Sequence, residues 1–431
     1  MPYNKKIAII NGHLIDPKNN IDEPKNLYIA DQQIVGIGNP PDGFNADKTI
    51  DANNLIICPG FIDLSVRLQQ PNIEYRSTQM EEVKASTASG ITTLCCPPDT
   101  SNTIDSPAIV DMMKRCSTES GGTKILPIGA LTTELDGRHL TEMATLKKAG
   151  CIAVSNGIHP MSNTLIQRRA MEYASTHNLT VFIHAEDPHL KNQGCVHEGM
   201  ISTRLGLPGI PATAEIVAVA TDLALAEEVQ VKIHFCRISS AKSVEMISHA
   251  RANGLNVTTD VSINHLHLTE YDIIDFNTNC HTIPPLRTQR DKDQLKQYLK
   301  NGDIQAICSN HSPLSEDAKL APFPETVPGI SGLDSYLPLA LKLVENNSLD
   351  LFTLINRLSY NPAQILQIPT GHLSINAPAD ICIFDPEMIW QLTPETMNSV
   401  GHNTPYMNWE LKGKVIWTLV NGQIAYQYKT Q

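Results

Sequence analysis

Histidine and carboxylate side chains follow several short apolar runs of the sequence, where parallel strands would bring them to one site. A catalytic zinc ion ordinarily takes three protein ligands and a water. His184 and His234 could hold one metal ion with help recruited from Asp99, Asp260 or His265, or they could be hydrogen-bonded within a polar pocket that holds no metal. The other polar residues at comparable positions are Ser65, Arg67, Ser155, Asn156, Glu186, Asp187, Arg237, Asn264, Asn310 and His311.

Residues 55–67 supply two of these side chains. The stretch reads Leu-Ile-Ile-Cys-Pro-Gly-Phe-Ile-Asp-Leu-Ser-Val-Arg, which is typical of a buried strand that delivers side chains to a site at its end. Because strand side chains alternate, Ser65 and Arg67 are expected to face the same way. No His and acid partner is implied beside Ser65, so its hydroxyl is expected to cap or pack rather than act as a nucleophile. Arg67 could fill a metal cavity and pair with Asp99 or Glu186.

Eight strand-like apolar runs alternate with helical segments in the middle of the chain. This alternation favours a closed (β/α)8 TIM-type barrel, in which function sits at the carboxyl ends of the strands. An open doubly wound sheet is the alternative, but no Gly-rich phosphate loop follows the first strand. The predicted strands are 61–68, 91–96, 124–130, 151–155, 181–184, 231–236, 256–261 and 304–309, and the predicted helices are 80–89, 107–115, 143–149, 164–177, 213–228, 241–253, 290–300 and 333–346.

Both ends of the chain have a different residue pattern from the predicted barrel. Short strand-like pieces separated by Asn, Asp, Gly and Pro turns fill the first 54 residues, and similar pieces return after residue 375. We therefore expect one small composite β domain from residues 1–54 and 375–431, and a (β/α)8 barrel from residues 55–374.

Composition excludes several classes of partner. The chain has 431 residues and a formal net charge of -12, so no basic surface is available for nucleic acid. No apolar run approaches the length of a membrane span, and no signal-peptide segment follows the N-terminus, so the cytoplasm is the expected location. The ten cysteines include no CxxC pair and are expected to be reduced, buried thiols.

Seven short segments carry a resemblance to a known family. They are Pro-Gly-Phe-Ile-Asp-Leu at 59–64, Gly-Ile-Thr-Thr-Leu-Cys-Cys-Pro-Pro-Asp-Thr at 90–100, His-Ala-Glu-Asp at 184–187, Pro-Pro-Leu-Arg at 284–287, Gly-Ile-Ser-Gly-Leu at 329–333, Asn-Pro-Ala at 361–363 and Ala-Asp at 379–380. Over nearly its whole length the chain resembles the dihydroorotases of the amidohydrolase superfamily, and in particular the inactive dihydroorotase-like chains associated with bacterial aspartate transcarbamoylase. The resemblance implies a (β/α)8 barrel with a β domain built from both termini.

The resemblance also implies a zinc site that opens or closes the dihydroorotate ring. The family's ligands are a His-x-His pair ending the first strand, an Asp or modified Lys that bridges two metals, two further His, and an Asp ending the eighth strand. The metals activate a water, and the last Asp carries its proton.

This chain departs from the family at that site. The His-x-His pair is replaced by Ser65 and Arg67, the bridging position resembles Asn156, and the last Asp is Asn310. A guanidinium about 4 Å from a divalent ion would cost on the order of 8 kcal/mol at an effective dielectric of ~20. With only the remnant ligands His184 and His234, we expect no catalytic residue at these degenerate positions and no zinc, or at most one weakly bound zinc.

The positions that the resemblance assigns to substrate recognition are changed as well. Gln69 replaces an Arg that grips the substrate carboxylate, and Asp99 replaces an Asn. Ile283 stands for another Asn and Leu314 for a His. A site that exchanges a cation for an amide and gains a carboxylate should repel an acidic substrate.

Three functions are consistent with these residues. The first is a catalytically degenerate dihydroorotase homologue that acts as a structural subunit, with the aspartate transcarbamoylase catalytic chain as the partner implied by resemblance and a homodimer or larger assembly expected. The second is an active zinc-dependent cyclic amidohydrolase with a rearranged metal site. The third is a metal-free small-molecule binder at the barrel mouth. The long loop 312–329 could serve as a lid in an enzyme or contact a partner in a structural subunit.

Overall fold

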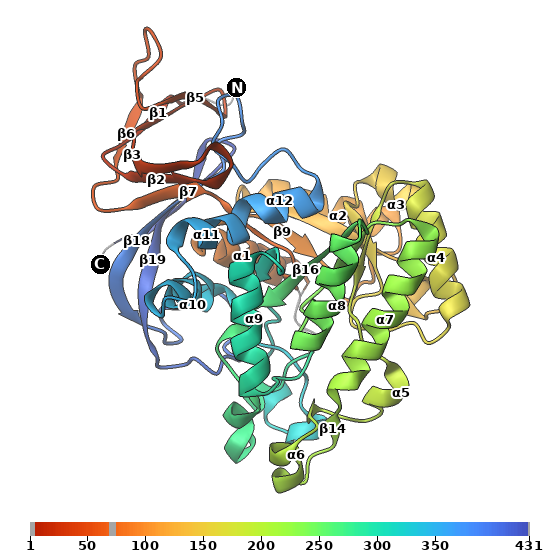
Figure 1. Ribbon diagram of the computed structural model, residues 1–431. Helices are drawn as coiled ribbons and strands as arrows, with labels where there is room; N and C mark the ends of the chain where they lie inside the picture. Colours follow the sequence, from red (N-terminus) through yellow and green to blue (C-terminus); the bar gives the residue numbers. More distant parts are fainter. Residues whose placement is uncertain (1–4, 69–74, 430–431) are drawn as a thin grey trace.

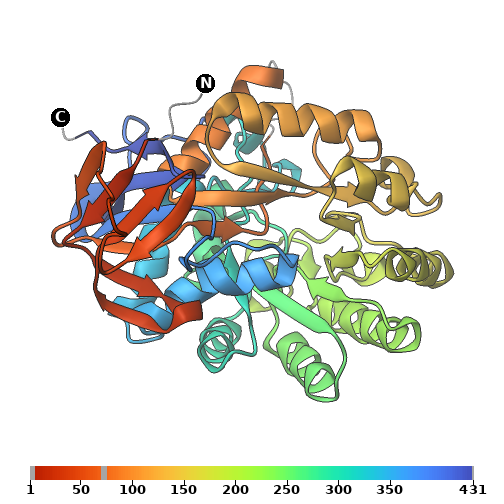
Figure 2. The ribbon, with the colours of Figure 1, turned by 90° about the horizontal axis from the view of Figure 1, so that it is seen from above.

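The predicted barrel is present, with helices around its strands (Figures 1 and 2). The computed structural model describes residues 5–68 and 75–429. Eight parallel strands follow one another around the barrel in chain order, and a parallel bridge between Val66 and His311 joins the last strand's end to the first. The strands are β8 (Phe61–Asp63), β9 (Ile91–Cys96), β10 (Lys124–Ala130), β11 (Ala153–Ser155), β12 (Thr180–Ile183), β15 (Ile233–Phe235), β16 (Val257–Ser262) and β17 (Ala306–Cys308).

All eight predicted helices lie between or after these strands. They are α1 (Tyr75–Ala88), α2 (Pro107–Ser120), α3 (Met143–Ala149), α4 (Thr164–Thr176), α7 (Ala212–Val229), α8 (Ala241–Ala252), α9 (Gln289–Asn301) and α10 (Leu333–Glu345). The shorter elements include α5 (Pro188–Lys191), α6 (Met200–Leu205), α11 (Leu351–Ile355), α12 (Asn361–Leu366) and the paired strands β13 (Val196–His197) and β14 (Gly209–Ile210). No helix within the described ranges is long and apolar enough to cross a membrane.

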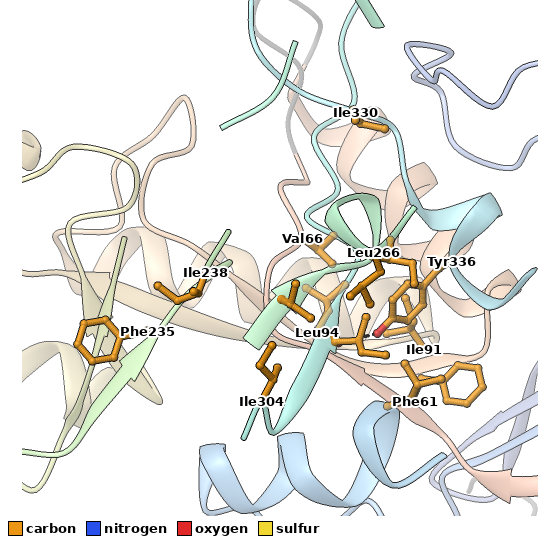
Figure 3. Close-up of a cluster of buried hydrophobic side chains, with 14 of the residues drawn as sticks. Phe61, Val66, Ile91, Leu94, Phe235, Ile238, Leu266, Ile304, Ile330 and Tyr336 are labelled. Carbon is orange, nitrogen blue, oxygen red and sulfur yellow. Dashed lines mark hydrogen bonds between the residues drawn. The ribbon is translucent and has the colours of Figure 1, made fainter. Parts of the chain in front are cut away.

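Buried apolar side chains hold the barrel together on both sides of its wall. One cluster joins Ile62, Phe182 and Cys308 to Ile365 of α12. A larger cluster lies between the strands and the surrounding helices (Figure 3), and in it Tyr336 donates a hydrogen bond to the carbonyl oxygen of Ile307 at 2.8 Å. All ten cysteines are unpaired and buried, as expected.

Residues 55–67 do not form one strand, because the chain changes sheet at the Pro-Gly break. β7 (Ile56–Pro59) belongs to the β domain and β8 to the barrel, so the first barrel strand is shorter than the predicted 61–68. Gly60 stands at the change. A Cβ there would lie 2.2 Å from the Thr92 side chain, so only glycine allows the strands to approach this closely.

Strands from both termini build the β domain. A six-stranded sheet has the order β20-β19-β18-β7-β2-β3, and a four-stranded sheet has the order β5-β4-β1-β6. The two sheets share a buried cluster of apolar side chains. The strands are β1 (Ile7–Ile10), β2 (His13–Asp16), β3 (Ile21–Pro24), β4 (Leu27–Ala30), β5 (Gln33–Ile37), β6 (Lys48–Asp51), β18 (Ile381–Gln391), β19 (Glu410–Val420) and β20 (Gln423–Gln427).

Candidate functional site at the barrel mouth

An ion pair joins the ends of the first two barrel strands. Arg67 donates from Nη2 to Asp99 Oδ2 at 2.7 Å, and the same oxygen accepts from the backbone N–H of Ile158 at 3.1 Å. Burial works to raise the pKa of Asp99, but the Arg67 guanidinium holds that pKa below its ordinary value. Of the two partners considered for Arg67, the structure therefore selects Asp99. Gly157 permits the approach, because a Cβ there would meet the Asp99 carboxyl at 2.5 Å.

A second guanidinium reaches the end of the first strand. Arg237 follows β15 in the left-handed region, with φ 53°, and donates from Nη1 to Ser65 Oγ at 3.1 Å. Its backbone N–H donates to Asp260 Oδ1, and its buried Nε has no hydrogen-bond partner among the described residues. Sequence reasoning placed Arg237 among the strand-end residues but gave it no role. The only feature of the sequence that pointed to Arg237 as a site residue was its position directly after a predicted strand.

His234 lies in the barrel wall and is fully engaged there. Its Nδ1 lies 2.9 Å from Thr258 Oγ1, and its Nε2 lies 3.2 Å from Asp260 Oδ2. Both His234 and Asp260 are completely buried. With both ring nitrogens occupied, His234 could bind a metal only by giving up one of these contacts.

His184 is bound less tightly. Its Nε2 is 3.6 Å from Glu186 Oε2 and makes no hydrogen bond to a described residue. Burial lowers the pKa of His184. Glu186 in turn pairs with Lys191 at 2.5 Å. Burial opposes ionisation of Glu186, but His184 and Lys191 together lower its pKa to about 2.

Asn156 and Asn310, which stand at positions that the resemblance assigns to carboxylate or modified-Lys ligands, have neutral hydrogen-bond partners. Asn156 Oδ1 accepts from Thr132 Oγ1 at 2.8 Å, and its Nδ2 donates to the carbonyl oxygen of His159 at 3.0 Å. Asn310 donates from Nδ2 to the carbonyl oxygen of Ile283 at 3.3 Å, so the structure brings these two assigned positions together.

Two further positions, Leu314 and Gln69, are assigned to substrate recognition by the resemblance. Leu314 is buried, and its backbone N–H donates to Asn403 Oδ1 at 2.9 Å. Gln69 lies outside the described residues.

The donor set at the mouth does not fit a catalytic zinc ion. In residues 5–68 and 75–429, no group of three or more His, Cys, Asp or Glu side chains is placed to hold a metal. The candidate helpers have other partners. Asp99 pairs with Arg67, and His265 Nε2 lies 3.2 Å from the carbonyl oxygen of Pro285.

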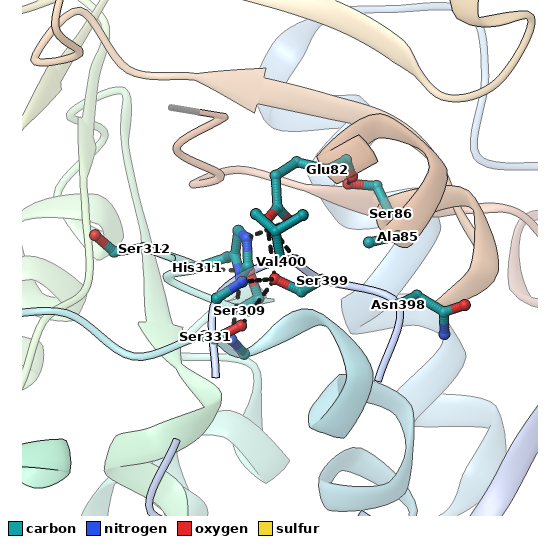
Figure 4. Close-up of polar contacts among 12 residues, drawn as sticks. Glu82, Ala85, Ser86, Ser309, His311, Ser312, Ser331, Asn398, Ser399 and Val400 are labelled. Atoms are coloured by element: carbon teal, nitrogen blue, oxygen red, sulfur yellow. Dashed lines mark hydrogen bonds and ion pairs between the residues drawn. The ribbon is translucent and has the colours of Figure 1, made fainter. Parts of the chain in front are cut away.

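Beside the mouth, a buried network fixes the last strand to the C-terminal segment (Figure 4). Glu82 Oε2 lies 2.9 Å from His311 Nε2, and both side chains are completely buried. The other carboxylate oxygen accepts from Ser399 Oγ at 3.0 Å and from the backbone N–H of Val400 at 3.1 Å. His311 is therefore structural.

Comparison with known proteins places the chain in a family. A model described as "Dihydro-orotase-like" matches residues 54–243. The "Dihydroorotase-like protein" of Pseudomonas aeruginosa is 42% identical over 421 residues, which cover 98% of this chain and 99% of that protein. The chain belongs to the dihydroorotase family of the amidohydrolase superfamily. The "Dihydroorotase" of Syntrophotalea carbinolica is 38% identical over 422 residues, with 98% and 99% covered.

Solved structures of related folds agree with the architecture of this dihydroorotase-family chain. The L-hydantoinase (dihydropyrimidinase) from Arthrobacter aurescens superposes with a TM-score of 0.84 at 19% identity, covering 97% of this chain and 96% of that one. Dihydropyrimidinase from Brevibacillus agri gives a TM-score of 0.82 at 20% identity, covering 97% and 94%. At these identities the likeness shows the fold alone.

Proposed function

We propose that this chain is a catalytically degenerate dihydroorotase homologue that serves as a non-catalytic structural subunit, with the aspartate transcarbamoylase catalytic chain of pyrimidine biosynthesis as its partner. The observation that carries the first half of this proposal is the pair of guanidinium groups at the end of the first strand. Arg67 stands at one of the two positions that the family resemblance assigns to first-strand metal ligands, and Arg237 contacts the other, Ser65, at 3.1 Å.

Two cations at that place oppose metal binding electrostatically. A zinc ion about 4 Å from one guanidinium would be repelled by on the order of 8 kcal/mol at an effective dielectric of ~20. Asn310 adds a second obstacle, because an amide has no protonation step near neutral pH and cannot carry the proton of an attacking water. Binding of metal and transfer of the proton are therefore both disfavoured by the residues present.

The partner half of the proposal is supported by the loop that follows the last strand. Lys319 donates from Nζ to the carbonyl oxygen of Thr278 at 3.0 Å, in the segment after β16, and to that of Val327 at 2.8 Å, within the loop itself, so the middle of loop 312–329 is held in place. Leu320, the next residue, is 78% exposed. An anchored loop that presents a large apolar side chain suits a contact surface better than a moving lid.

Co-expression with the aspartate transcarbamoylase catalytic chain of the same organism tests this assignment. We expect the two chains to elute together from a sizing column at micromolar concentration. Leu320→Asp should weaken the complex, whereas Ile389→Asp, a change at a 63% exposed residue of β18 in the β domain, should leave it intact. Separate elution of the wild-type chains would count heavily against the partner.

An active zinc-dependent cyclic amidohydrolase with a rearranged metal site is the second candidate. One observation favours it, because His184 Nε2 is buried and makes no hydrogen bond to the described residues, which leaves it available as a ligand. Metal analysis of protein purified without chelator, together with an assay of dihydroorotate turnover, separates the two candidates. Near-stoichiometric zinc with turnover would favour the enzyme, and their absence in folded protein would favour the structural subunit.

A further inference from the structure

A cavity of about 110 Å³ lies beside the barrel mouth, outside the wall formed by β11 and β12. It is enclosed by the loop that follows β11 and by α4, α5 and α7, which lie together at one side of the barrel (Figure 1). Met161, Met171 and Ala218 give it an apolar wall. Asp222 and Gln167 give it a polar end, and His184 lines it from the barrel side.

Asp222 is the unusual group in this cavity. The side chain is 2% exposed, and Gln167 donates from Nε2 to Oδ1. Gln167 is the hydrogen-bond partner that the structure gives this carboxyl group. Burial raises the pKa of Asp222 to about 8, and the Gln167 hydrogen bond offsets this only in part. A buried carboxyl group is ordinarily paired with a cation, and here no such partner is supplied.

The ionisable side chains that line the cavity include acids but no Lys or Arg among the described residues. The acids are Asp187, Glu186 and Asp222. Asp187 is engaged as the N-cap of α5, and Glu186 is paired with Lys191. Asp222 is therefore the acid that remains open to a ligand. A second open group points to a ligand as well, because buried His184 Nε2 has no hydrogen-bond partner among the described residues.

We propose that this cavity binds a small organic cation, a primary ammonium or guanidinium group on a short apolar stem, with the cationic group on Asp222 and the stem against Met161, Met171 and Ala218. The cavity is smaller than the roughly 150 Å³ cavity that accommodates benzene, so its size restricts the ligand to a short stem. The site is independent of the proposed subunit function, since it uses none of the guanidinium groups at the mouth and none of loop 312–329.

Binding of n-butylammonium to the full-length protein, followed by saturation-transfer NMR and calorimetry, tests the proposal. Its uncharged isostere n-butanol fills the same apolar space without the charge. At pH 9, above the Asp222 pKa of about 8 and with the amine still protonated, we expect the amine to bind roughly tenfold or more tightly than the alcohol, because charge-assisted hydrogen bonds are the strong ones. Equal binding of the two compounds, or no binding of either to folded protein, would overturn the proposal.

Substitutions of residues that line the cavity test whether the ligand binds there. Asp222→Asn keeps an acceptor for Gln167 and should remove the preference for the amine, whereas Glu227→Gln, a change at an exposed acid of the same helix α7, should preserve it. If Asp222→Asn does not fold, Ala218→Leu keeps the carboxyl group but fills the space, and it should abolish binding of both compounds. An unchanged preference in the folded variants would refute the site.

A further experiment distinguishes a free small-molecule cation from a cationic side chain of another protein. A blocked pentapeptide with a single central Arg presents the same guanidinium on a protein backbone. Binding of n-butylguanidinium but not of the peptide would identify a free small molecule as the ligand, and comparable binding of both would identify a side chain of another protein. Failure of both guanidinium compounds, with n-butylammonium bound, would restrict the ligand to a primary ammonium, and failure of all three would contradict the assigned chemistry.

Discussion

Arg67 and Asp99 form a 2.7 Å ion pair in which the carboxylate side chain is 2% exposed and the guanidinium side chain 13% exposed. The pair links the end of β8 to the chain that follows β9. It also unites two positions that are separate in the sequence and that the family resemblance assigns to different tasks, Arg67 to metal binding and Asp99 to substrate recognition. The carboxylate at position 99 compensates the cation at position 67.

That asymmetry of burial predicts unequal effects of the two single mutations. Arg67→Met leaves a buried carboxylate without its cation and should cost about 3–5 kcal/mol of unfolding free energy. Asp99→Asn should cost less, because Arg67 is closer to water and the amide can still accept from Ile158. The double variant should recover part of the loss. Urea denaturation of all four proteins measures the coupling, and a loss below about 1 kcal/mol for Arg67→Met would contradict the pairing.

Arg237 predicts that restoring the family's ligand types will not be enough to restore metal binding. A variant with Ser65→His, Arg67→His, Asn156→Asp and Asn310→Asp still places the Arg237 guanidinium against the residue at position 65. We expect less than about 0.1 zinc per chain after dialysis for this variant, and at least about 0.5 when Arg237→Ala is added. Metal analysis by mass spectrometry measures both. Full zinc occupancy with Arg237 in place would show that its contact with position 65 is no obstacle.

The buried Asp222 carboxyl predicts a pH-dependent stability. Its pKa is raised from 3.8 to about 8 by burial, so the stability it contributes is full below about pH 4 and is lost as the pH rises toward 8. The other titratable groups that line its cavity are His159, His184, Glu186, Asp187 and His189. Asp222→Asn should therefore match the wild type near pH 4 and exceed it increasingly at higher pH, by at most about 1.4 kcal/mol per pH unit.

Chemical denaturation from pH 4 to pH 9 measures that difference. Glu227→Gln, at an exposed position of the same helix, controls for loss of one negative charge and should show no comparable trend. A difference between Asp222→Asn and wild type that stays constant with pH would mean that Asp222 does not titrate in this range.

The hydrogen bonds of Glu82 predict that its substitution lowers the stability of the whole protein and also loosens one segment. Glu82→Ala removes the acceptor for His311, Ser399 and Val400 in a fully buried place, and should cost about 3–5 kcal/mol. It should also release residues 398–403, so limited proteolysis should cut there before elsewhere. Lys84→Ala on the exposed side of α1 is the matched control and should leave both stability and cleavage unchanged.

The barrel could be predicted from the sequence because short, largely buried strands alternate with helical segments eight times. Runs such as Ile91–Cys96 are short and rich in β-branched residues, which favours a strand over a helix, and all eight predicted strands are present. The break within 55–67 was visible as Pro-Gly, but apolar periodicity does not tell which sheet each half joins. That assignment depends on β18, more than three hundred residues later in the chain.

The site was predictable only where chain position determines it. Residues directly after strands were expected at the mouth, and the Arg67 and Asp99 pair was among the alternatives considered. The contact between Arg237 and Ser65 depends on a left-handed backbone conformation at Arg237, which a non-glycine residue rarely signals in its sequence. The Asp222 cavity depends on the distance between α4 and α7. The periodicity of apolar residues predicts each helix but not how far apart the two helices lie.

β7 lies between β2 and β18 in the sheet, so one of its two neighbours is synthesised long after it. About 320 residues separate the end of β7 from the start of β18. At roughly 5–20 residues per second, a ribosome leaves the edge of β7 unpaired for roughly 15 to 65 s after that strand emerges. During this interval the nascent chain exposes a strand edge that can pair with other chains, so the yield of folded protein should depend on how quickly translation reaches β18.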